Sequence, residues 1–128
     1  MALLGMGCGL LLLLACGESV PGTLVRDVAA FEAAVAAAQP GDRSILANGV
    51  WRDAELVFTG TGTAEQPIIL TVQEKGWVTL EGQSNLRIAG EYLHVEGLVF
   101  TNGYTPTKEV IAFRKDKQNL CSHCRVTE

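Results

Sequence analysis

The chain has little positive charge and no long apolar run, and each shortage excludes a class of protein. Its 128 residues carry 10 lysine and arginine residues against 14 aspartate and glutamate residues, for a net charge of −4. This balance argues against nucleic-acid binding, which usually needs a basic surface. The apolar segment at residues 1–15 is shorter than the roughly 20 residues that a membrane-spanning helix needs.

Few of the four cysteines are available for a metal or redox site. Cys8 lies in the apolar leader and Cys16 directly follows it, so Cys121 and Cys124 remain, spaced C-x-x-C around His123. A structural zinc ion needs four ligands, and the sequence has no second Cys/His pair. A thioredoxin-like site needs a βαβ pattern, which is absent at this motif. Two interpretations stay open: small buried apolar residues at a turn, or a local disulfide in an oxidising compartment.

The first residues have the features of an export signal. Residues 1–15 have the length of a signal-peptide core, and the LLACG sequence at 13–17 resembles the lipobox of bacterial lipoproteins. We therefore expect a lipoprotein-type signal peptide (1–15), lipidation at Cys16 and a polar tether (16–24). A plain secretory signal stays open, because no lysine or arginine precedes the apolar run.

The expected location is therefore outside the cytoplasm. We expect an exported protein, either an outer-membrane lipoprotein or a periplasmic or extracellular protein. Contact with a membrane would be made through the lipid anchor alone, since the leader is too short to span a bilayer.

Residues 25–38 form the one convincing helical pattern. Asp27 is a suitable N-cap, and the Pro-Gly pair at 40–41 ends the helix. Apolar residues at helical spacing line one face: Val28, Phe31, Val35 and Ala38. A short helix of this kind suits a cap over the open end of a stack of strands.

Short strand-like runs follow the helix and recur to the end of the chain. They alternate or cluster β-branched and aliphatic residues, and each meets a turn signal within a few residues. The runs are residues 43–47, 54–58, 68–72, 78–82, 86–90 and 92–100. No second helical pattern separates them, which excludes a doubly wound α/β fold. An antiparallel sandwich and a parallel β-helix stay open.

Three features favour the β-helix. The runs are short, apolar residues such as Leu86 and Ile88 alternate, and the segments at 80–82 and 95–97 share a Glu-Gly exit. We predict an all-β, right-handed parallel β-helix over residues 25–128, whose N-terminal coils carry an amphipathic capping helix. Because each coil of a solenoid buries its face against its neighbours, and no cap pattern closes the chain, we expect a larger protein truncated on its C-terminal side.

Two further motifs are more specific than this general pattern. They are Glu-Gly-Gln-Ser at 81–84 and Val-Glu-Gly-Leu-Val-Phe-x-Asn-Gly at 95–103. Together with the helix and the Pro-Gly-Asp segment at 40–42, they resemble the N-terminal coils of polysaccharide lyase family 6, the alginate lyase and chondroitinase B group. The likeness covers about residues 25–127.

The resemblance implies an enzyme that cleaves an anionic polysaccharide of uronic acids, alginate or a chondroitin or dermatan type, by β-elimination. In this family a bound Ca²⁺ neutralises the substrate carboxylate, a lysine takes the C5 proton, and an arginine assists departure of the C4 oxygen. These residues belong to later coils, so none maps onto this chain, and we expect the chain alone to be inactive. The alternatives are a non-catalytic glycan-binding surface protein, a degenerate lyase, or a uronan epimerase.

Basic residues gather near the end of the chain, although the whole chain is acidic. Arg114, Lys115 and Lys117 are candidate substrate-binding residues, since arginine and lysine pair with carboxylates. A solvated turn of mixed charge is the alternative interpretation.

Three other polar residues could suggest a metal site. Glu81, Asn85 and Glu96 lie at predicted strand ends. Because Asn and Glu are ordinary residues at such ends, we assign them no metal role.

Overall fold

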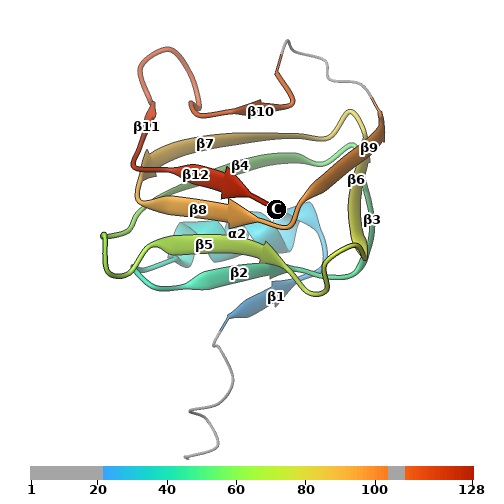
Figure 1. The fold of residues 1–128 in the computed structure, drawn as a ribbon, viewed down its shortest axis with the longest axis horizontal. Coiled ribbons are helices and arrows are strands. Elements are labelled where there is room, and N and C mark those ends of the chain that lie inside the picture. The colour runs from blue at the N-terminus through green and yellow to red at the C-terminus, as the bar shows by residue number, and fades with distance from the viewer. Residues whose placement is uncertain (1–21, 104–108) are drawn as a thin grey trace, which may run out of the picture.

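The computed structural model describes residues 22–103 and 109–128, which wind into a parallel β-helix (Figure 1). The first sheet has the order β1 (Thr23–Val25), β2 (Arg43–Leu46), β5 (Ile68–Val72), β8 (Leu93–Glu96) and β12 (Arg125–Thr127). The second contains β3 (Gly49–Arg52), β6 (Val78–Gly82) and β9 (Val99–Gly103). In the third, β7 (Asn85–Glu91) pairs with β4 (Glu55–Thr61), β10 (Ile111–Ala112) and β11 (Cys121–Ser122). These parallel pairings confirm the β-helix and exclude the antiparallel sandwich.

The core is built from columns of apolar side chains that repeat from coil to coil. Leu56 of β4 pairs in register with Leu86 of β7, which pairs with Ile111 of β10. Both leucines are completely buried. Full burial of a leucine side chain contributes about 1.5–3 kcal/mol. The strands alternate in burial because only every second side chain faces this interior.

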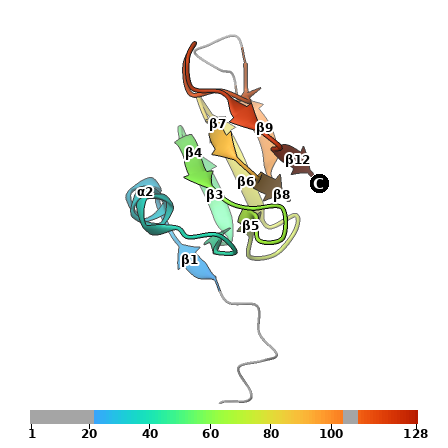
Figure 2. The ribbon, with the colours of Figure 1, turned by 90° about the vertical axis from the view of Figure 1, so that its left-hand side faces the viewer.

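The capping helix is α2 (Val28–Ala37), which packs against β1, β2 and β4 (Figure 2). Its N-cap is Asp27, as predicted, since the Asp27 Oδ1 accepts a hydrogen bond of 2.8 Å from the Ala30 backbone N–H. Phe31 is completely buried, and its ring centroid lies 6.5 Å from that of Phe58 on β4. The predicted apolar face of the helix therefore covers the start of the third sheet.

The predicted helix start is wrong by three residues. The prediction placed Val25 in the helix, but Val25 lies in β1 and pairs with Leu46 of β2. The Val25 carbonyl also accepts a hydrogen bond of 2.9 Å from the Ala47 N–H. Pairing with a sheet edge satisfies backbone groups that a first helical turn would leave unpaired, and this outweighs local helix propensity.

The predicted run at 92–100 is two strands and not one. A turn at Gly97, with φ of 83°, separates β8 from β9. Tyr92 precedes β8 at a corner, with φ of 53°. The predicted strand at 54–58 is also longer in the structure, because β4 extends to Thr61 along the whole of β7.

A disulfide joins Cys121 and Cys124, which is one of the two interpretations that the sequence left open. It spans the corner between β11 and β12, where His123 has φ of 56°. The His123 ring stacks on that of Tyr92, at the equivalent corner of the preceding coil, with 4.5 Å between centroids. The disulfide and the stacked rings hold this corner in a fixed conformation.

The signal peptide predicted at 1–15, together with Cys8 and Cys16, lies outside the described residues. Within residues 22–103 and 109–128, no helix has the length and apolar character to span a bilayer.

Candidate functional site

The three basic residues predicted to contact substrate lie on one exposed loop. This basic loop, residues 113–120, connects β10 to β11 above the third sheet (Figure 1). Its ends meet in an antiparallel bridge between Arg114 and Leu120. Inside that bridge the Lys115 N–H donates a hydrogen bond of 2.8 Å to the Asn119 carbonyl. The loop is therefore a closed hairpin with a defined shape.

Asp116 holds the tip of the basic loop. Its carboxylate accepts hydrogen bonds of 2.9 and 2.8 Å from the backbone N–H groups of Gln118 and Asn119. The Asn119 side-chain amide also donates to it, at 2.9 and 2.8 Å. The Asn119 side chain, these two backbone donors and the charge of Lys115 lower the pKa of Asp116. The ionised Asp116 carboxylate therefore stabilises the loop at neutral pH, and this stabilisation is lost as the pH falls through the lowered pKa of Asp116.

The three basic side chains have different surroundings. Arg114 forms an ion pair with Glu109, with 3.2 Å between its Nη2 and the Glu109 Oε2. Lys115 lines a groove beside the loop, and Lys117 is exposed at the tip. The structure thus brings the three cations onto one loop but directs Lys115 toward a concave surface.

That concave surface is the loop groove, which lies between the basic loop and the strands β4 and β7. Its volume is about 410 Å³. It is lined by residues 59–61 of β4, residues 89–90 of β7, and Lys115, Gln118, Asn119 and Leu120 of the loop. The sequence did not identify the groove, because it forms between coils whose register is not local information.

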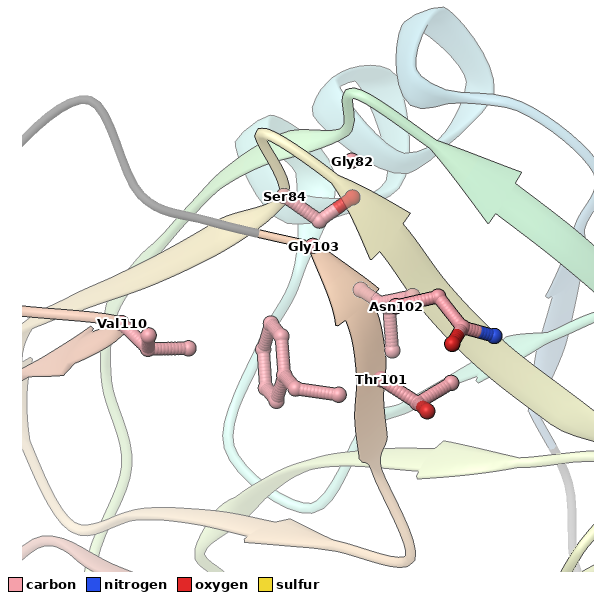
Figure 3. Close-up of a pocket in the computed structure, with 8 residues that line it drawn as sticks. Gly82, Ser84, Thr101, Asn102, Gly103 and Val110 are labelled. Carbon is pink, nitrogen blue, oxygen red and sulfur yellow. The ribbon is translucent and has the colours of Figure 1, made fainter.

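A second hollow of about 300 Å³ lies where β6 and β9 meet Val110 (Figure 3). Leu80 and Phe100, which belong to the core columns, form part of its wall. The Ser84 hydroxyl, which also borders it, accepts from the Ala54 N–H at 2.9 Å and donates to the Glu81 carbonyl at 2.6 Å. Since that hydroxyl is committed to the turn, Ser84 holds the backbone here and is not an activated nucleophile.

The three residues to which the sequence analysis assigned no metal role, Glu81, Asn85 and Glu96, have structural contacts. Glu81 pairs with Arg52 at 3.3 Å, and Glu96 pairs with Arg43 at 3.9 Å. Asn85 is 3% exposed and donates a hydrogen bond to the backbone. Among the described residues, no group of three or more His, Cys, Asp or Glu side chains could hold a metal ion. These residues therefore do not fit a Ca²⁺ site.

Comparison with known proteins gives consistent results. The family model for chondroitinase B matches residues 25–128. The alginate lyase AlyGC, of polysaccharide lyase family 6, is 55% identical over 83% of this chain, with a TM-score of 0.81. A mannuronic acid specific family 6 lyase from the human gut microbiota is 29% identical over 82% of the chain, with a TM-score of 0.75. A family 6 polysaccharide lyase from Pseudopedobacter saltans is 28% identical over 82%, with a TM-score of 0.72.

The chain spans a small part of these enzymes. It covers 15% of AlyGC, 25% of the gut enzyme and 24% of the Pseudopedobacter enzyme. A comparison with curated protein sequences gave no match. The family match over 25–128, the identity with AlyGC and the shared parallel β-helix agree, and the chain belongs to the chondroitinase B family of polysaccharide lyases.

Proposed function

We propose that the protein carrying this chain is an exported polysaccharide lyase that cleaves uronic acid polysaccharides. The observation that carries the proposal is the 55% identity with an alginate lyase over 83% of the chain. The similarity to a mannuronic acid specific lyase supports the same class of substrate. Alginate is therefore the first substrate to test, and chondroitin or dermatan sulfate is the second.

The proposed reaction is a β-elimination. A base takes the proton from C5 of the uronate, the C4–O bond breaks, a C4=C5 double bond forms, and the departing oxygen receives a proton. We place the base, the acid and the ligands of a Ca²⁺ cofactor outside this chain. The basic loop would attract the polyanion, with Lys115 and Lys117 exposed to it and Arg114 paired beside them.

The test is the release of unsaturated uronate by the full-length protein, followed by its ultraviolet absorbance. We expect product from alginate with Ca²⁺ present, loss of most activity with a chelator, and recovery when Ca²⁺ is restored. No product from alginate, chondroitin sulfate or dermatan sulfate, with Ca²⁺ present, would sink the proposal. Binding of alginate without turnover would support the non-catalytic alternative.

Export by a lipoprotein signal is part of the proposal. The disulfide between Cys121 and Cys124 supports an oxidising compartment, where disulfides persist. We expect the wild-type protein to incorporate labelled palmitate and to fractionate with membranes. Cys16→Ser should abolish both, whereas Cys8→Ser, a matched change in the leader, should abolish neither. Unlabelled wild-type protein in the soluble fraction would indicate a plain secretory signal.

A further inference from the structure

The floor of the loop groove is recessed into the outer face of the third sheet. Along β7, Leu86 and Ile88 are completely buried in the core, so Arg87 and Ala89 lie on the outer face. Ala89 is nevertheless 5% exposed. Because the Ala89 side chain is on the outer face but almost inaccessible, neighbouring residues must project above the sheet around it.

Part of the floor is backbone, contributed by two glycines. Gly60 of β4 and Gly90 of β7 pair in register there. A Cβ on Gly90 would overlap the Gly60 carbonyl oxygen, so the two backbones approach as closely as glycine permits. Thr59 and Thr61 flank Gly60 and also line the groove. The floor therefore offers backbone and hydroxyl groups to a polar ligand.

The walls of the groove add positive charge. Lys115 lines it directly, and Arg87 lies two residues before Ala89 on the same outer face, about 7 Å along the strand. The Asp116 carboxylate, on the same loop, is hydrogen-bonded within the loop. Glu91, which follows Gly90, is the acidic side chain nearest in sequence to the floor. Among the residues that line the groove, Lys115 is the one with a charged side chain, which favours an anionic ligand.

We propose that the loop groove binds one carboxylate-bearing sugar unit of an anionic polysaccharide. Lys115 pairs with the carboxylate, and the Gln118 amide and the threonine hydroxyls bind the sugar hydroxyls. The volume of about 410 Å³ lies in the range of small-molecule sites. The choice of ligand rests on the proposed function, but the groove acts in binding and not in bond cleavage.

The test measures binding and turnover separately, in the full-length protein. Calorimetry with an alginate hexasaccharide gives Kd, and initial rates give kcat and KM. We expect Lys115→Ala to raise Kd and KM about tenfold with kcat retained, and Gln118→Ala to raise Kd about threefold. Lys75→Ala is the charge-matched control, because Lys75 lies on the turn between β5 and β6, and it should stay within about twofold of wild type.

Lys117→Ala distinguishes binding at a local site from general electrostatic attraction of the polyanion to the basic loop. Lys117 is not among the residues that line the groove, so its removal should weaken binding less than removal of Lys115. Equal losses from the two variants would overturn the groove as a site and leave only long-range attraction. If the wild type turns alginate over and Lys115→Ala has the same Kd and KM as the wild type, the groove is not a binding site, while the lyase proposal stands. Binding weakened by Lys115→Ala in a protein without turnover would support the groove and reject the lyase.

Discussion

We expect Gly90→Ala to lower the local free energy of unfolding of the third sheet by about 4 kcal/mol or more. Gly90 has φ of 131°, a conformation that alanine adopts only with strain. Its new Cβ would also overlap the carbonyl oxygen of Gly60 on the neighbouring coil. Because the clash is with the backbone of a paired strand, relief requires that β4 and β7 separate. The floor of the loop groove would be lost with them.

Gly49→Ala is the matched control for this prediction. Gly49 has nearly the same φ, 133°, but a Cβ there would meet nothing within 4 Å. Gly49→Ala should therefore lower the free energy of unfolding only by the cost of the strained backbone conformation, about 2 kcal/mol. Native-state hydrogen exchange of the full-length protein measures the change in Gly90→Ala at the amides of β4, β7 and β11, and the change in Gly49→Ala at those of β3 and β6. Equal losses in the two variants would show that the close approach of the coils contributes nothing.

Local patterns in the sequence were sufficient for much of the fold. The runs at 68–72 and 78–82 coincide with β5 and β6, and Asp27 caps the helix as predicted. In each case the signal is short-range: alternation of apolar residues, a glycine at the exit, or a side-chain acceptor three residues from its donor. The short runs without a second helix between them excluded a doubly wound fold, and their length, alternation and shared exits favoured the parallel β-helix.

What the sequence could not supply depends on contacts between coils. The split of 92–100 into β8 and β9 requires the corner at Gly97, and apolar residues continue on both sides of it. The pairing of Gly60 with Gly90, and hence the groove floor, requires the register between coils. The three basic residues were found from composition, but their different surroundings depend on the hairpin that carries them and on Glu109.

The capping helix gives the second large effect, and we expect Phe31→Ala to destabilise the first coil by about 3–5 kcal/mol. Phe31 is completely buried, and its ring packs on Phe58 of β4. The alanine side chain would leave a cavity between the helix and the first strand of the third sheet. The affected amides are those of β1, β2 and β4, which α2 contacts, and their hydrogen exchange in the full-length protein measures the loss.

Phe113→Ala makes the same chemical change at an exposed position. Phe113 is 46% exposed on the basic loop, so its removal should cost about 0.5 kcal/mol or less.

The comparison of the two variants also tests whether the helix protects the end of the strand stack. β4 has a paired neighbour on one side, β7, and α2 packs against it. If the helix protects that strand, Phe31→Ala should raise light scattering on gentle warming while Phe113→Ala does not, because a detached helix uncovers a strand edge that can pair with another molecule. A Phe31→Ala protein with wild-type exchange and no added scattering would show that the strands close this end without the helix.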